Sequence, residues 1–426
     1  MFKWFLAMKP AAILFASISL CILSAQSAPP AEPNSVTVPI TLDHNRIVID
    51  VFLPLPDGST KRVRGWVDNG NPDLEMSRRA ATLMGLSVSC DEKACSAPPP
   101  REITIGGMKV SLASVKEAKI PLKPVNAATV MAPGMSAEIN LPSVVLRQYD
   151  VLVSFPDREF SIGHPGTLKF KGVSSKVALN SENGLVQVPS EIEGKKYHLA
   201  LDVGASISFL SEELFDKVSR THPDLPQMNG AIGPANMWGL DEEPKWKLMR
   251  VNRLHYGPLF LTDVAMADFF KEGMAWFEKR AGIPTAGLLG SNALLNYRVG
   301  IDYAHSTVYF DIGNTFRAPD FDVVGLTLRP EDDGRFTILA VADFNGKPSV
   351  PEVQANDHLV AVDGIPVPDS TMGQVWSLLE GTPGQERKLT LEHAGKQFTV
   401  LAKVQHFLGE GTPEEKEGQG KTKLKN

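Results

Sequence analysis

Two aspartates occupy the same short motif in distant parts of the chain. Asp68 and Asp202 each follow two apolar residues, and each is followed after one residue by a glycine, Gly70 or Gly204. Two carboxyl groups held about 3 Å apart cannot both ionise, so they share one proton; the charged group can activate a water while the protonated group donates to a carbonyl. The alternative is two structural turn residues, because Asp-x-Gly is common in loops.

Both motifs belong to a longer internal repeat. Each lies between two predicted strands, and a serine follows that is suited to begin a helix, over residues 78–84 and 212–218. Farther along, residues 139–155 match residues 287–303. The two aspartates are 134 residues apart, and the two tyrosines of the later block are 148 residues apart. The second copy therefore has 14 extra residues between its two blocks. Two matched blocks in the same order indicate a duplication.

This pattern resembles the pepsin-like and retropepsin-like aspartic peptidases. The shared features are apolar-apolar-Asp-x-Gly, then apolar-apolar-Gly after an intervening β-region, then Tyr-x-Val-x-Ile-Asp-Tyr, and the second copy is the closer match. The resemblance covers about residues 36–312. It implies a mainly β fold with two tandem acid-protease-like β-barrel lobes, 36–163 and 172–313, that form a bilobal cleft, with Asp68 and Asp202 as the catalytic pair.

The residues after the aspartates depart from the family pattern, in which Thr or Ser bonds across to the other lobe and supports the pair. Asn69 and Val203 stand there in this sequence; Asn can donate and accept a hydrogen bond, whereas Val has no polar side-chain atom. Pro142 replaces the closing glycine of the first copy. Two hypotheses therefore stay open: an aspartic endopeptidase that cleaves polypeptides, and a peptide-binding protein that has lost the chemistry.

A peptidase of this class also needs a hairpin lid that excludes water from the substrate. Gly230, Gly233 and Trp238 supply the glycines and the aromatic residue of a candidate flap in the second copy, and a surface loop with one packed Trp is the alternative. The corresponding segment of the first copy, residues 96–100, contains three consecutive prolines and is predicted to be too stiff.

The composition changes after Phe316, where a third unit begins. Strands are predicted at 336–342, 388–392 and 397–404, with a helix over 371–379. This order resembles the PDZ domains of bacterial proteases over residues 318–404, and it implies that a peptide C-terminus adds to a sheet edge beside the helix. The groove candidates are apolar, and core packing is the alternative for them: Leu326, Leu328, Met372, Val375 and Trp376.

The first 28 residues are predicted to be a signal peptide. Lys3 and Lys9 are followed by an apolar stretch over residues 11–25 and then by small residues. A retained membrane anchor is the alternative; after cleavage we expect no membrane span and a periplasmic or secreted protein. Cys90 and Cys95 then remain as an even pair, which predicts a small-loop disulfide in an exported protein.

Composition and charge exclude several classes of protein. The formal net charge of −6 gives no basic surface for nucleic acid. With 43% hydrophobic and 22% charged residues, the chain is predicted to be globular rather than disordered or multi-span. The nine histidines lack ligand spacing, so no metal or cofactor is predicted. The expected partners are polypeptide substrates and, at the third unit, peptide C-termini; residues 406–426 are predicted to be a disordered tail.

Overall fold

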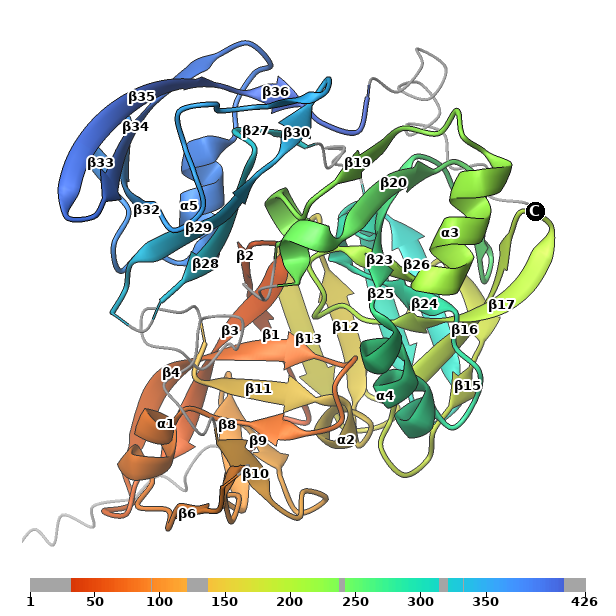
Figure 1. Cartoon of the computed structure of the whole chain (residues 1–426). Helices are drawn as coiled ribbons and strands as arrows, with labels where there is room; N and C mark the ends of the chain where they lie inside the picture. Colours follow the sequence, from red (N-terminus) through yellow and green to blue (C-terminus); the bar gives the residue numbers. More distant parts are fainter. Residues whose placement is uncertain are drawn as a thin grey trace, which may run out of the picture. The chain divides into compact units, whose positions relative to one another are not determined.

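Strands dominate the described part of the chain (Figure 1). The computed structural model describes residues 32–92, 94–120, 137–236, 242–313, 321–331 and 333–409. The predicted signal peptide and residues 410–426 of the predicted tail lie outside these ranges. The prediction of a disordered tail is wrong for residues 406–409, because His406 pairs with Asp322 in a two-stranded sheet and Phe407 and Leu408 are buried.

The first copy is built mainly from two sheets. One has the order β11-β4-β3-β8-β9, with β2 paired to β3, and the other has the order β5-β10-β7-β6. Ser77 begins α1 by accepting a hydrogen bond from the N–H of Ala80. The elements are β1 (Ser35–Pro39), β2 (Thr41–Asp43), β3 (Arg46–Pro54), β4 (Thr60–Asp68), β5 (Leu74–Glu75), α1 (Arg78–Leu83), β6 (Ser89–Cys90), β7 (Cys95–Ala97), β8 (Glu102–Ile105), β9 (Met108–Ser111), β10 (Ala118–Ile120), β11 (Ile139–Pro142), α2 (Ser143–Leu146), β12 (Asp150–Ser154) and β13 (Glu159–Gly163).

The second copy contains one large sheet with the order β19-β20-β23-β18-β24-β17-β16-β21-β22, and β15 pairs with β16. Ser211 begins α3, whose first turn carries two glutamates that suit the positive end of a helix. The elements are β14 (Val173–Lys176), β15 (Ala178–Leu179), β16 (Val186–Ile192), β17 (Lys195–Leu201), β18 (Ser208–Ser211), α3 (Glu212–Thr221), β19 (Gln227–Asn229), η1 (Gly233–Ala235), η2 (Glu243–Lys245), β20 (Lys247–Val251), β21 (Leu254–Tyr256), β22 (Leu259–Leu261), β23 (Val264–Phe269), α4 (Lys271–Ala281), β24 (Gly287–Leu289), η3 (Ser291–Ala293), β25 (Tyr297–Asp302) and β26 (Thr307–Ile312).

One antiparallel sheet joins the two copies, with the order β1-β13-β12-β25-β26-β14. At its centre β12 pairs with β25, and Leu152 lies opposite Gly300. These two residues are equivalent positions of the repeat, 148 residues apart. The pairing is therefore symmetric about this point, as expected when two duplicated units are related by a local twofold axis.

The C-terminal region forms a separate sheet with the order β28-β29-β32-β34-β35, in which β33 pairs with β32. β28 lies at one edge, and its neighbour along the chain, Val324, donates from its backbone N–H to Leu379 at the end of α5. The strands and the helix lie close to the ranges predicted from sequence. The elements are β27 (Asp322–Val323), β28 (Leu326–Pro330), β29 (Phe336–Val341), β30 (Asp343–Phe344), β31 (Lys347–Pro348), β32 (His358–Val362), β33 (Ile365–Pro366), α5 (Met372–Leu379), β34 (Glu386–His393), β35 (Lys396–Lys403) and β36 (Gln405–His406).

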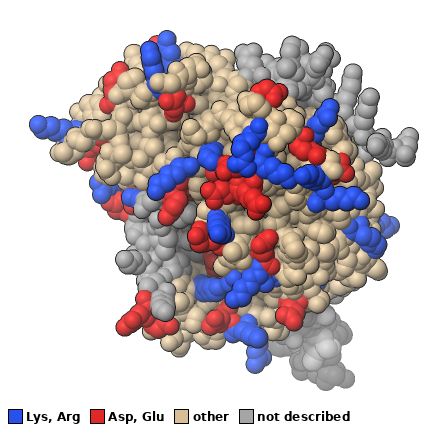
Figure 2. All heavy atoms as spheres, turned by 45° about the vertical axis from the view of Figure 1, so that its right-hand side comes forward, with Lys and Arg blue, Asp and Glu red and all other residues tan. Residues whose placement is uncertain are grey.

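Acidic and basic side chains are mixed on the surface. Figure 2 shows Lys and Arg side chains beside Asp and Glu side chains across the drawn face. This distribution agrees with a small negative net charge. Within the described ranges, every helix falls short of the length and hydrophobicity that a membrane crossing requires.

Candidate active site

Each of the two predicted catalytic aspartates follows a buried strand that is held in the same way. Val67, before Asp68, pairs in parallel with Leu141 of β11, and Leu201, before Asp202, pairs in parallel with Leu289 of β24. Leu141 and Leu289 are equivalent positions of the repeat. The apolar residues before each aspartate are buried and hold the strand ends in place, so the repeated pattern positions both motifs in one register.

The structure brings the two motifs together through their glycines. A Cβ atom built on Gly70 would lie 2.1 Å from Oδ2 of Asp202, and one built on Gly204 would lie 2.8 Å from Oδ1 of Asp68. Each carboxyl group therefore lies against the backbone of the opposite motif. A side chain at either glycine would push the loops apart, which explains why the motif needs glycine at this position.

Trp66 donates from Nε1 to the carbonyl oxygen of Gly204 at 3.2 Å, and Asn69 links the two motifs with two further bonds. Its Nδ2 donates to the carbonyl oxygen of Leu201 at 2.8 Å, and its Oδ1 accepts from the backbone N–H of Val203 at 2.8 Å. Asn69, Leu201 and Val203 are almost completely buried. The Asn69 amide thus uses both its donor and its acceptor to bond to the second motif. The Val203 side chain makes no corresponding hydrogen bond to the first motif. The support is one-sided, and Val203 contributes only its backbone.

The loops after β11 and β24 are also equivalent. The backbone N–H of Ser143 donates to Asn71, and that of Ser291 donates to Ala205, each at 2.8 Å. Asn71 and Ala205 occupy the same position after their aspartates. The two motifs are therefore held by the same backbone bond, although the first copy has Pro142 where the second has a glycine.

Pro142 fits because the neighbouring strand is held by a side chain. In the second copy Leu288 pairs directly with Phe209, and a Cβ on Gly290 would lie 2.3 Å from the oxygen of Ile207. In the first copy the residue equivalent to Leu288 is Asn140. Its Oδ1 accepts from the N–H of Glu75 at 2.8 Å and its Nδ2 donates to the oxygen of Asp73 at 3.0 Å. In the first copy the Asn140 side chain thus fills the gap between the two strands. In the second copy direct backbone hydrogen bonds close this gap.

The two carboxyl groups have unequal surroundings. Burial, followed by the negative charge of Asp202, raises the pKa of Asp68 well above its usual value, although the Asn140 amide and the Gly70 N–H oppose the shift. Burial raises the pKa of Asp202 to about 6, against the hydrogen bonds from the N–H groups of Gly204 and Ala205. Those two bonds, at 2.9 and 3.0 Å, favour its charged form. The surroundings therefore favour the charged form of Asp202 and the protonated form of Asp68, within a pair that titrates as a unit.

Three further residues act on Asp68 that the sequence analysis did not single out. Asn140 is completely buried and lowers the pKa of Asp68, whereas the negative charge of Glu75 raises it. The guanidinium of Arg46 is 1% exposed and lies within electrostatic range of Asp68. Asn140 occupies the position of Leu288 in the second copy, and Glu75 occupies that of Phe209. A polar residue at a position that is apolar in the other copy is therefore the sequence signal for both.

The candidate flap differs from the expected lid. Trp238 lies outside the described residues, and Gly230 and Gly233 fall in the connection between β19 and β20. Both have a positive φ, +91° and +55°, which favours glycine. The adjoining residues 231–236 are buried against the C-terminal region, as detailed below, except that Pro234 is half-buried. Residues 230–236, the described part of the candidate flap, are therefore packed inside the protein rather than exposed.

The five candidate groove residues of the C-terminal region are buried as well. Leu326, Leu328, Met372, Val375 and Trp376 are each at most 2% exposed. They belong to one hydrophobic cluster that also includes residues of the second copy. The core-packing interpretation holds for all five in this state of the protein.

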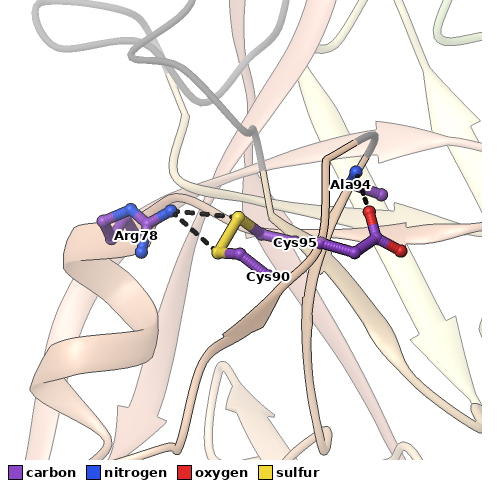
Figure 3. The surroundings of a disulfide bond; sticks show 5 residues. Arg78, Cys90, Ala94 and Cys95 are labelled. Carbon is purple, nitrogen blue, oxygen red and sulfur yellow. Dashed lines mark hydrogen bonds between the residues drawn. A yellow bond between two sulfur atoms is a disulfide. The ribbon is translucent and has the colours of Figure 1, made fainter.

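Cys90 and Cys95 form the expected disulfide, which joins β6 to β7 with an S–S distance of 2.07 Å (Figure 3). Arg78 of α1 points its Nη2 toward both sulfur atoms, 3.2 Å from that of Cys95. The bridge therefore fixes the hairpin beside the first helix. Among the described residues, His, Cys, Asp and Glu side chains form no group of three or more placed to hold a metal.

No protein-family model matches the chain, and no curated protein matches it. The crystal structure of an aspartic proteinase from Irpex lacteus aligns with 11% identity and a TM-score of 0.41, covering 66% of this chain and 98% of that one.

Proposed function

We propose that the protein is an aspartic-type endopeptidase that cleaves polypeptides with Asp68 and Asp202. The observation that carries the proposal is the mutual approach of the two motifs, in which each carboxyl group lies against the glycine of the other. The unequal pKa values of the pair add support, because a shared-proton mechanism needs one charged and one protonated carboxyl group.

The surroundings of each aspartate favour a division of roles. Asp202 accepts two backbone hydrogen bonds and is the more easily ionised, so it acts as the base that takes a proton from the attacking water. Asp68 stays protonated and donates to the oxygen of the scissile carbonyl. The water oxygen bonds to the carbonyl carbon, and the proton held by Asp202 then passes to the leaving nitrogen as the C–N bond breaks. No covalent enzyme intermediate forms.

The departures at Val203 and Pro142 are compatible with this proposal. Asn69 alone supplies a donor and an acceptor across the pair, and Asn140 accommodates the proline. These two amide side chains, together with Trp66, which bonds to Gly204, position the pair of aspartates, here called the dyad. The peptide-binding alternative has no comparable observation in its favour, and the test below separates the two.

We propose further that the chain is exported and that residues 321–409 form a PDZ-like module that binds peptide. The support is the arrangement of β28 as an edge strand with α5 beside it, which suits the addition of an extended peptide. The signal-like composition of residues 1–28 and the Cys90–Cys95 disulfide support export to an oxidising compartment.

The activity is tested with purified protein that begins at Pro33 and a broad library of unstructured peptides analysed by mass spectrometry. Asp68→Asn and Asp202→Asn should each reduce turnover on the order of 10²–10⁴-fold, because each removes one half of the acid–base pair. Asp224→Asn is the matched control, since Asp224 is exposed in the turn that follows α3 and belongs to neither motif. Saturable peptide binding without turnover by the unsubstituted protein would contradict the proposal and favour a peptide-binding protein.

A further inference from the structure

The edge strand of the C-terminal sheet is already in contact with another part of the chain. Asn236 of the second copy donates from Nδ2 to the carbonyl oxygen of Leu328 at 2.6 Å. Thr327 donates from Oγ1 to the carbonyl oxygen of Ala231 at 2.9 Å. Thr327 and Asn236 are completely buried. Residues 231–236, here named the docking segment, therefore bind β28 at the position that an added peptide strand would use.

The docking segment also shares a hydrophobic core with the C-terminal region. Ala231, Ile232 and Ala235 have no exposed surface and belong to the same cluster as Leu328 and Val375. Removing these apolar side chains from water stabilises the contact. The docking segment thus has the features expected of a peptide ligand, namely small and branched apolar side chains and a polar group that bonds to the edge strand.

A second element from the first copy covers the helix side of the same region. The ring of His44, in the turn between β2 and β3, stacks on Trp376 of α5 with a centroid distance of 5.7 Å and an interplanar angle of 15°. Its Nε2 lies 2.6 Å from the carbonyl oxygen of Gly233 and donates to it. Burial, and then the charge of Arg46, lowers the pKa of His44 to about 3, so the ring is neutral at physiological pH.

The start of α5 is occupied too. Oδ1 of Asp43 accepts from Oγ1 of Thr371 and from the backbone N–H of Gly373, each at 2.7 Å. A carboxylate is well suited to the N-terminal end of a helix, where backbone N–H groups are unpaired. Asp43 and His44 therefore fix α5 to the first copy, while the docking segment fixes β28 to the second.

We propose that the edge formed by β28 and α5 is an internal docking site filled by residues 231–236, and that an external apolar peptide binds there only by displacing this segment. The inference rests on the peptide-binding role proposed for the C-terminal region, but it does not require the dyad to be active. The physical basis is exclusion, because the carbonyl of Leu328 and the hydroxyl of Thr327 cannot bind the docking segment and an external peptide at once.

Displacement of the docking segment would change the surroundings of the dyad. Ser206, four residues after Asp202, donates from its hydroxyl to the carbonyl oxygen of His44. Nδ2 of Asn45 lies 3.4 Å from the carbonyl oxygen of Ser206. The same turn thus contacts α5, the docking segment and the loop that follows Asp202, so a peptide that moves the docking segment alters the support of the second motif.

The test uses the chain from Pro33 to Asn426 with Asp202→Asn throughout, so that no probe is cleaved. Thr327→Val and Asn236→Ala, alone and together, remove the two bonds to β28. Thr399→Val and Asn229→Ala are matched controls, because both residues are exposed, Thr399 lies on the opposite edge strand β35 and Asn229 precedes the segment. Hydrogen exchange should become faster in residues 231–236 of the double variant and stay unchanged in β34 and β35, which report that the domain is folded.

Binding is measured by fluorescence anisotropy with a fluorescein-labelled peptide of residues 229–236. Asn236→Ala alone should bind this probe about fivefold more tightly than the parent, a change of about 1 kcal/mol, because the probe keeps the asparagine that the variant's own segment lacks. Thr327→Val removes the same bond from the segment and from the probe, so its affinity, like that of the controls, should match the parent. Equal affinity in the parent and the Asn236→Ala variant, an absence of binding in both, or unchanged exchange in the docking segment of the double variant would overturn the inference. Because cleavage is not measured, a failed peptidase assay leaves this result unaffected, and the reverse also holds.

Discussion

Asn69 offers the sharpest test of how the two motifs are held together. Asn69→Ala removes the donor to Leu201 and the acceptor for Val203, and it leaves a buried carbonyl and a buried N–H without partners. Each such group costs about 1–3 kcal/mol, so we expect a total loss of about 2–6 kcal/mol in the free energy of unfolding. That is a large part of the roughly 5–15 kcal/mol that stabilises a typical domain.

Catalysis should suffer in parallel, because the same bonds position the dyad. A displacement of about 1 Å can reduce the rate on the order of 10²-fold, and kcat is the parameter expected to fall. Unfolding in urea followed by tryptophan fluorescence gives the change in stability, and the peptide assay gives kcat. Asn69→Thr should restore much of both, since a hydroxyl also donates and accepts.

Asn180→Ala is the matched control, because the Asn180 side chain also bonds to two backbone groups, the carbonyl oxygen of Arg280 and the N–H of Glu182, and neither belongs to the two motifs. It should cost roughly 0.5–1.5 kcal/mol per lost bond and leave kcat near that of the parent. If Asn69→Ala kept the urea midpoint and kcat of the parent, the proposed role of this side chain would be refuted.

Other predictions follow from the charges and the disulfide. Activity should rise as the pH passes about 6, because below that value Asp202 is protonated and cannot act as a base. Activity should fall again at the pH where Asp68 ionises. A kcat/KM profile with its rising limb near pH 4 would contradict this assignment. Glu75→Gln removes a negative charge that raises the pKa of Asp68, so the alkaline limb should move to lower pH; an unmoved limb would show that Glu75 has no influence on the pair. The double variant Cys90→Ser, Cys95→Ser should lower the free energy of unfolding by about 2 kcal/mol, as expected for so short a loop, with little effect on kcat. A large loss of activity in folded protein would show that the disulfide does more than fix the hairpin.

The duplicated motifs could be predicted because they depend on local patterns. Apolar pairs before Asp68 and Asp202 define buried strands, and Ser77 and Ser211 mark the starts of two helices that the structure contains. The α4 helix, Lys271–Ala281, was not predicted. It contains Gly273 and two aromatic residues, and it ends at Gly282 with a positive φ of 76°.

The polar support of the site was predictable only in part. The amide of Asn69 was expected to donate and accept, but its two partners are backbone groups of the second copy, which no side-chain pattern reveals. Asn140 becomes visible only when it is compared with Leu288 of the other copy. Its role depends on strand spacing, which a sequence does not encode locally.

The C-terminal region shows where local patterns fail. The sequence identifies α5 and the strands, and the apolar residues Leu328 and Trp376 suit either a groove or a core. Their burial depends on residues 231–236 and His44, which lie far away in sequence and bond to this region through backbone carbonyls and ring stacking. Contacts of this kind follow from tertiary packing rather than from periodicity.

The most direct measurement of the central claim is the titration of the two carboxyl carbons. Protein labelled with ¹³C at the aspartate carboxyl groups is followed by NMR from pH 3 to 9, and Asp68→Asn and Asp202→Asn assign the two signals. We predict that one carbon titrates near pH 6, that the other stays protonated well above it, and that Asp202→Asn lowers the pKa of Asp68. Two independent titrations near the ordinary aspartate value of about 3.9 would show that the carboxyl groups share no proton.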